Sequence, residues 1–218
     1  MKRTNYTPSN ALSTLILLLI ITFTAQSQEA IIPEAASDTL HPANGLYTRY
    51  FPDNKTVKTL VNYKNNKKDG ECKGYYRTGQ LRYLGFYKND VEDGKFEKYR
   101  KDGSLIKRAF YKNGQLNGVY EEYYPNGQVY TRQQYKKGVV QKAEAFYENG
   151  KIKKIVALKD GKINGKCKVY NTEGTVIALY LYKDGKKDGE QKVYDDSGKL
   201  IKTEIYKAGK RIKTEYQK

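Results

Sequence analysis

The sequence predicts an all-β fold: an extended antiparallel β-meander of about seven tandem two-stranded repeats, largely one sheet thick. Three observations support this prediction. A similar segment recurs about every 24 residues, which indicates a repeat array. Asp-Gly and Asn-Gly dipeptides, which favour tight hairpin turns, separate short segments of strand-like composition. No helical periodicity follows residue 28.

The clearest repeat unit is residues 94–117, GKFEKYRKDGSLIKRAFYKNGQLN. We expect its first strand at about Lys95–Arg100 and its second at about Leu105–Lys112. Asp102-Gly103 turns the chain between the two strands, and Asn113-Gly114 turns it back. These dipeptides accept positive φ at little cost, so they suit turns that match the twist of the strands. The unit therefore predicts two hairpin turns per repeat.

The same unit recurs along the chain, and each copy starts at the residue after its second turn. The starts are Gly45, Gly70, Gly94, Gly118, Lys142, Gly165 and Gly189. A tyrosine stands five residues after every start: Tyr50, Tyr75, Tyr99, Tyr123, Tyr147, Tyr170 and Tyr194. A second aromatic column closes the second strand at Tyr63, Tyr87, Tyr111, Tyr135, Tyr182 and Tyr206, with Leu158 as the exception. The fifth copy starts with Lys142 in place of glycine and is one residue short before Gly150, so a bend or a bulge is expected there.

Alternation within the strands favours a single sheet over a sandwich. In the segment 105–111, Leu105, Lys107, Ala109 and Tyr111 share one face, and the other face is equally mixed. A sandwich needs one clearly apolar face per strand. We therefore expect cross-strand ladders of tyrosines to stabilise the sheet. The last residues, 210–218, look like one further strand with a charged outer edge that caps the array.

The N-terminal part of the chain predicts export. Residues 1–27 combine Lys2 and Arg3, a short apolar core and a final Ala-Gln-Ser, the features of a secretory signal peptide cleaved before about Gln28. A membrane anchor is the alternative, but the apolar core is well short of the roughly 20 residues that cross a bilayer. Residues 28–44 contain two prolines and no periodicity, which indicates a flexible leader before the repeat array of residues 45–218. The expected location is the periplasm, the cell envelope or the medium, with no transmembrane segment after cleavage.

The net charge narrows the class of partner. The chain carries a formal net charge of +17, and about +15 remains after removal of the basic signal residues. Such a charge attracts acidic proteins, anionic envelope glycans or lipid headgroups. Nucleic acid is not expected as a partner of an exported protein. A second explanation is that lysines protect the open sheet edges from pairing with other chains, because they are spread over all the repeats.

The repeat also carries a family resemblance. YKNGQLNGVYEEYYPNGQV (Tyr111 to Val129) and YKDGKKDGEQKVYDDSGKL (Tyr182 to Leu200) share the pattern Tyr-x-x-Gly-x-x-x-Gly-x-x-x-x-Tyr. This pattern resembles the bacterial MORN-repeat-variant proteins, commonly labelled YwqK-family antitoxins, over about Gly45 to Gly209. The resemblance implies a β-hairpin array and a protein-binding role, in some members neutralisation of a partner toxin. It supplies no catalytic residues, and the export signal distinguishes this chain from a cytoplasmic antitoxin.

Residues for catalysis or metal binding are scarce. His41 is the only histidine and lies in the leader, so neither a Ser-His-Asp triad nor a usual His/Cys metal site is expected within the repeats. Neighbouring acids such as Glu121-Glu122 point to opposite faces of a strand and are interpreted as solvated. Cys72 and Cys167 occupy equivalent positions four repeats apart, roughly 35–40 Å in a straight array, too far for a disulfide. We expect no enzyme activity, no cofactor and no metal.

The sequence-based hypothesis is therefore an exported, non-catalytic binding or scaffold repeat protein with a protein partner. The alternative is a toxin-neutralising immunity protein of the YwqK type. The expected contact residues form a row on one face, about 9–10 Å apart in successive hairpins. They are Tyr75, Tyr99, Tyr123, Tyr147 and Tyr170. A purely structural role in the tyrosine ladder is the other explanation for this row.

Overall fold

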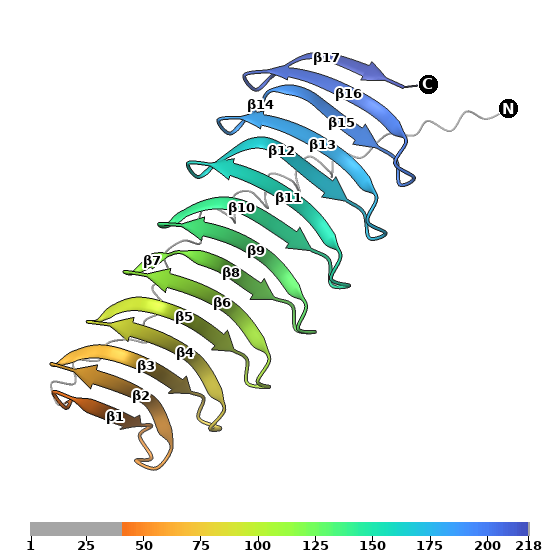
Figure 1. Cartoon of the computed structure of the whole chain (residues 1–218). Coiled ribbons are helices and arrows are strands. Elements are labelled where there is room, and N and C mark those ends of the chain that lie inside the picture. The colour runs from red at the N-terminus through yellow and green to blue at the C-terminus, as the bar shows by residue number, and fades with distance from the viewer. Residues whose placement is uncertain (1–40, 218) are drawn as a thin grey trace. The chain divides into compact units, whose positions relative to one another are not determined.

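In the computed structural model, residues 41–217 are described, and they form one open antiparallel sheet of 17 strands without a helix (Figure 1). No helix in that part of the chain has the length and apolarity needed to cross a membrane. The strands are β1 (Gly45–Tyr50), β2 (Val57–Lys64), β3 (Lys67–Tyr75), β4 (Leu81–Lys88), β5 (Val91–Tyr99), β6 (Leu105–Lys112), β7 (Gln115–Leu116), β8 (Gly118–Tyr123), β9 (Val129–Lys136), β10 (Val139–Phe146), β11 (Ile152–Lys159), β12 (Lys162–Tyr170), β13 (Val176–Lys183), β14 (Lys186–Lys187), β15 (Gly189–Tyr194), β16 (Leu200–Lys207) and β17 (Lys210–Tyr216).

Strands pair in chain order from β1 to β17, with β6 pairing with both β7 and β8 and β13 with both β14 and β15. The two-residue strands β7 and β14 continue into β8 and β15, so the 17 strands form 15 rungs of the sheet. The predicted all-β meander of tandem hairpins is confirmed. The additional strand expected at the C-terminus is β17, which pairs with β16.

The hairpin turns have the backbone that the dipeptides predict. Asn113 and Gly114 both have positive φ, 49° and 75°, as the two central residues of a tight hairpin turn require. Asp102 shapes the other turn, because its carboxylate accepts a hydrogen bond from the backbone N–H of Ser104 at 2.8 Å. The chain therefore turns back at these points with local interactions, before any packing between repeats.

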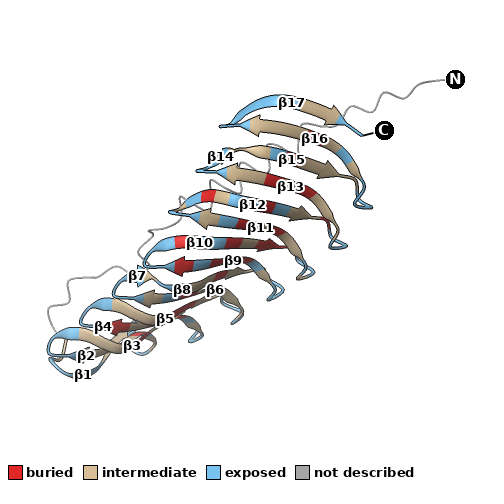
Figure 2. Ribbon diagram, turned by 45° about the horizontal axis from the view of Figure 1, so that its top comes forward, coloured by how far each residue is buried: buried red, intermediate tan, exposed pale blue. Residues whose placement is uncertain are grey.

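The two faces of the sheet differ more than the alternation of residues suggests. Side chains that lie opposite one another in a strand pair share a face. One face, here called face A, carries Cys72, Phe96 and Ala109, which are almost fully buried although the sheet is one layer thick. The ring of Tyr83 covers Gly74 so closely that a Cβ at Gly74 would lie 1.9 Å from it. Face A is thus a thin core, in which aromatic rings cover small residues of neighbouring strands. Figure 2 shows buried segments along the strands and exposed turns.

Hydrogen bonds outside the strand ladder join each repeat to the next. The residue that follows the first strand of a repeat donates to the backbone carbonyl oxygen at the same end of the following repeat. These bonds are Tyr76 OH to Tyr99 O (2.7 Å), Arg100 Nη2 to Tyr123 O (2.9 Å), Tyr124 OH to Phe146 O (2.9 Å) and Tyr147 OH to Tyr170 O (2.8 Å). Such side-chain bonds fix the spacing of the repeats at this edge of the sheet.

In the fifth repeat, the strand register differs by one residue from the repeat alignment that the sequence predicts. Ala143 pairs with Gln133 and Val156 on its two sides, as Phe96 pairs with Gly85 and Ala109. Gln141, two residues before Ala143, therefore takes the place of the repeat-start glycine, and not Lys142. The register between β9 and β10 has one extra residue on β10 between Val140 and Lys142, whereas β5 has two extra residues relative to β4. The missing residue thus falls before Gln141 and not before Gly150.

The predicted signal peptide and the leader as far as residue 40 lie outside the described residues. The last leader residues contact the first repeat. The ring of His41 stacks on Tyr63, with centroids 4.1 Å apart, and Ala43 O accepts a hydrogen bond from Asn66 N at 2.8 Å. The repeat array therefore begins a few residues before Gly45, and the expected flexible leader does not extend to Asn44.

Candidate binding face

Four of the five predicted contact tyrosines occupy equivalent positions. Tyr75, Tyr99, Tyr123 and Tyr170 each stand at the register shift where the first strand of a repeat ends. At the same shift, β10 has Phe146. All four tyrosines are half-buried. They lie two residues from the central row of the second face, here called face B.

Tyr147 does not belong to this row. It follows β10, and its backbone N–H and C=O close the next turn with Lys151 and Gly150. The one-residue alignment shift in the fifth repeat places Phe146 in the row and moves Tyr147 to the position of Tyr124. Its hydroxyl is already used in the hydrogen bond to Tyr170 O. The prediction of an unbroken tyrosine row is wrong at this position.

The central row of face B is a ladder of alternating charges. Cross-strand pairing places Glu97 opposite Arg108, Arg108 opposite Glu121, Glu121 opposite Arg132, and Arg132 opposite Glu144. Five successive rungs thus carry acid, base, acid, base and acid. Opposite charges directly across a strand pair stabilise the sheet, and this order also specifies the register. These five residues are here called the charge ladder.

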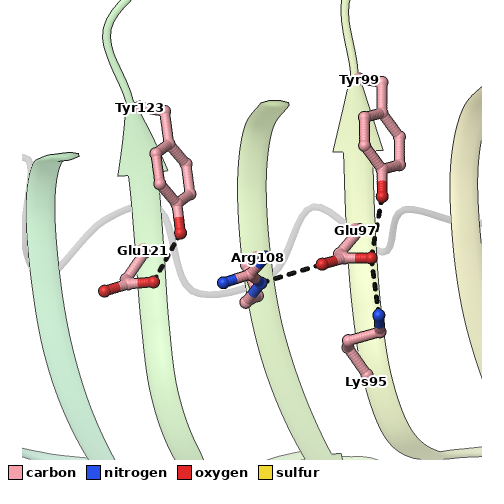
Figure 3. Close-up of polar contacts among 6 residues, drawn as sticks. All are labelled: Lys95, Glu97, Tyr99, Arg108, Glu121 and Tyr123. Atoms are coloured by element: carbon pink, nitrogen blue, oxygen red, sulfur yellow. Dashed lines mark hydrogen bonds and ion pairs between the residues drawn. The ribbon is translucent and has the colours of Figure 1, made fainter. Parts of the chain in front are cut away.

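The contacts around Glu97 show how the ladder is built (Figure 3). Arg108 Nε donates to Glu97 Oε1 at 2.9 Å, and Lys95 Nζ lies 2.8 Å from Glu97 Oε2. The Tyr99 hydroxyl donates to the same Oε2 at 2.8 Å. Glu97 is only 4% exposed. A carboxylate that is buried to this extent requires such partners, and here it has three.

The next repeat reproduces the arrangement. The Tyr123 hydroxyl donates to Glu121 Oε2 at 2.6 Å, and Arg132 Nε donates to Glu121 Oε1 at 2.7 Å. Arg132 also lies 3.8 Å from Glu144. The interpretation of Glu121 and Glu122 as solvated is wrong for Glu121, which is buried in the ladder. Glu122, the next residue of the strand, points to the opposite face, face A, as expected. It accepts a hydrogen bond from the Tyr120 hydroxyl at 2.7 Å.

The protonation of these groups follows from their surroundings. Burial raises the pKa of Glu97, but hydrogen bonds from Lys95, Tyr99 and Arg108 outweigh it and leave the pKa below its usual value. Glu121 behaves in the same way. Burial, followed by the hydrogen bond to the carboxylate, raises the pKa of Tyr99 to about 12. At neutral pH the carboxylates are therefore charged and the phenols remain donors.

Tyr75 and Tyr170 lie in a different environment from Tyr99 and Tyr123. Two residues before them stand Lys73 and Lys168, where the central repeats have Glu97 and Glu121. Within residues 41–217, neither hydroxyl donates a hydrogen bond to a carboxylate. The rings of Tyr75 and Tyr170 are thus accompanied by a lysine, while the central tyrosines are held by the ladder.

Groups for other chemistry are limited in the described part of the chain. There, no group of three or more His, Cys, Asp or Glu residues is placed to hold a metal ion. Cys72 and Cys167 are unpaired and buried at equivalent positions of face A. Burial raises the pKa of both thiols, which is the opposite of what a reactive cysteine needs.

The fold defines a repeat protein with an open β-sheet, built from stacked hairpins. The family model described as "MORN repeat variant" matches five segments, residues 68–89, 92–113, 116–137, 142–160 and 187–208. The chain therefore contains MORN-variant repeats, which extend through β3–β11 and recur at the C-terminal end. No curated protein is significantly similar to the chain.

Solved structures add little. One match is the crystal structure of a mutant of S. aureus TarM in complex with fondaparinux, α-GlcNAc-glycerol and UDP. The identity is 15%, the match covers 73% of this chain and 24% of that chain, and the TM-score is 0.26. This chain therefore spans about a quarter of that protein, and so distant a likeness carries no argument.

Proposed function

We propose that the protein is an exported, non-catalytic scaffold that binds a protein partner through face B. MORN-variant repeats are consistent with a repeat-type scaffold. The observation that carries the proposal is that Tyr75 and Tyr170 each have a lysine two residues earlier on this face. These lysines are Lys73 and Lys168. A tyrosine ring supplies a large amphipathic contact area at little cost in side-chain entropy. Lys73 forms an ion pair with Glu71 at 2.6 Å, so Lys168 and the net charge of +17 speed the encounter with an acidic surface.

The central repeats contribute differently. Tyr123 and Tyr99 remain on the same face, but their hydroxyl groups are already bound to Glu121 and Glu97. They therefore offer the ring and not the hydroxyl to a partner. In this proposal the ladder keeps the face flat and the register fixed, and the tyrosines outside it supply polar contacts.

The test uses the mature protein as bait for an extract of the cell envelope. A partner of face B should be retained by the unmodified protein and released by salt. The substitutions Tyr75→Ser, Tyr170→Ser and Tyr123→Ala should each weaken its binding. Tyr123→Phe keeps the ring and retains most of the binding. Tyr216→Ser, at an exposed tyrosine of β17, is the matched control and leaves binding unchanged.

Further measurements separate the parts of the proposal. Treatment of the extract with proteinase removes a protein partner but leaves a glycan or a lipid. N-terminal sequencing of the recovered protein checks export, which predicts a start near Gln28. If folded Tyr75→Ser and Tyr170→Ser variants retain the partner with unchanged affinity, face B is not the binding surface.

The alternative function is toxin neutralisation, which the resemblance of the sequence to YwqK-family antitoxins implies. It predicts that the partner is a toxin whose gene lies next to the gene for this protein. Co-expression of the two proteins should then restore the growth that the toxin alone inhibits. A partner that is harmless when expressed without the repeat protein excludes this function and leaves the scaffold proposal unaffected.

A further inference from the structure

The sheet has two edges, and they differ in chemistry. The edge strand β17 carries Lys210, Arg211, Lys213 and Glu215 among its seven residues. The other edge strand, β1, has the sequence GLYTRY, with Arg49 as its only charge. Charged side chains on an edge strand discourage pairing with another chain. The β17 edge is therefore protected by this means, and the β1 edge is not.

Exposed apolar side chains flank the β1 edge. Leu46 is 57% exposed and Tyr50 is 49% exposed, at the two ends of the strand. Among the described residues, β2 is the one strand that pairs with β1, so the outer N–H and C=O groups of β1 have no strand partner there. An edge with these properties is a template for an added strand.

The repeats themselves show what covers such an edge. Strand β3 is the equivalent of β1 in the second repeat, and its outer edge is covered by β2. There Lys73 lies opposite Leu60, Cys72 opposite Val61, and Gly74 opposite Thr59. The equivalent positions of β1 are Thr48, Tyr47 and Arg49. A strand that continued the array would place an aliphatic residue opposite Thr48 and a small apolar residue opposite Tyr47.

We propose that the outer edge of β1 binds an extended, acidic segment of another protein as an added antiparallel strand in the register of β2 on β3. A second copy of this chain is disfavoured as the occupant, because two ends of a protein with a net charge of +17 repel each other. The strands that cover equivalent edges within the array, such as β2 and β4, are already internal. The occupant thus combines the alternating pattern of β2 with negative charge. This site is separate from face B and does not rest on the function proposed for it.

The probe is a synthetic peptide with the sequence of β2 in which both lysines are replaced by glutamate, labelled with fluorescein. Its binding to the mature protein is measured by fluorescence anisotropy. We expect saturable binding that weakens with salt. Two N-methylated peptides, methylated on alternate residues, distinguish an added strand from side-chain contacts. In one of them the methyl groups block the N–H groups that face β1, and this peptide should not bind. In the other they block the N–H groups that face away from β1, and this peptide should bind like the parent peptide.

Two protein variants place the site. Leu46→Glu puts a negative charge on the β1 edge, the same sign as the charge of the peptide. It should lower the affinity for the peptide by about ten-fold or more. Ile212→Glu makes the same change on β17, at a residue that is 62% exposed, and leaves the affinity unchanged. Both side chains are exposed, so neither change disturbs the buried face A. Absence of saturable binding, equal binding of the two methylated peptides, or greater loss with Ile212→Glu than with Leu46→Glu would each overturn the proposal. Face B variants test the other site, so either proposal can fail without the other.

Discussion

The charge ladder predicts a measurable coupling between Glu121 and Arg132. Glu121 is 8% exposed and accepts bonds from Tyr123 and Arg132. Hydrogen bonds to charged groups contribute roughly 1.5–3 kcal/mol where both partners are buried. Because Arg132 is 43% exposed, its part is screened by solvent. We expect Glu121→Gln to cost about 2 kcal/mol in total, of which about 1 kcal/mol is coupling to Arg132.

A double-mutant cycle with Glu121→Gln and Arg132→Gln measures this coupling. Repeat arrays can unfold in parts, so the free energy of local opening is read from hydrogen exchange of the β8 and β9 amides. The matched control is the pair Glu190–Lys192, 2.8 Å apart, in which the carboxylate side chain is 54% exposed and the coupling should be below about 0.5 kcal/mol. A coupling between Glu121 and Arg132 no larger than that of the control pair would refute the ladder as a source of stability.

Three further predictions follow from the same contacts. Deletion of residues 94–117 should leave a shorter folded sheet, measured by circular dichroism, whereas deletion of a single strand should unfold it because strand direction reverses. The folded-state pKa values of Glu97 and Glu121 are lowered, so their stabilisation is present above the unfolded carboxylate pKa of about 4.3 and is lost as pH falls through the lower folded values. Acid titration followed by amide exchange should therefore open β5–β9 more than β11–β13, strands that contain no Asp or Glu. Tyr147→Phe should lower the melting temperature by removing a bond of about 1 kcal/mol, whereas Tyr170→Phe should not.

The repeat architecture was readable from sequence because local chemistry determines it. Positive φ at Asn113 and Gly114, and at the equivalent turn residues, places one tight hairpin turn in each repeat whatever the neighbours are. Strand existence, order and the C-terminal extra strand follow from that spacing. Equivalent placement of Cys72 and Cys167 on face A follows as well, since both are two residues from a repeat start.

The charge ladder was not readable because it depends on bulges. Glu97 and Arg108 are eleven residues apart, Arg108 and Glu121 thirteen, and Arg132 and Glu144 twelve. These unequal spacings give no period, and a register change of one residue moves a side chain to the other face. The same sensitivity explains the error at Tyr147, where the loss of one residue near Val140 was assigned to the wrong side of the repeat start. Alternating Glu and Arg in successive strands was the available signal.

The ladder also makes a prediction about the tyrosines outside it. Lys168→Glu gives Tyr170 the carboxylate two residues earlier that Glu97 supplies to Tyr99. The hydroxyl of Tyr170 should then donate to that carboxylate, as the hydroxyl of Tyr99 donates to Glu97.

The chemical shift of the Tyr170 hydroxyl proton, assigned by comparison with Tyr170→Phe, measures this hydrogen bond by NMR. Lys168 is exposed, so stability should change little. Binding to the face B partner should fall because the hydroxyl is occupied and a positive charge is lost. Lys166→Glu, an exposed lysine on the same strand and face, removes the same charge without reaching Tyr170 and is the control for charge. If Lys168→Glu and Lys166→Glu weaken binding of the partner equally, the effect is one of net charge, and the hydroxyl of Tyr170 has no part in recognition.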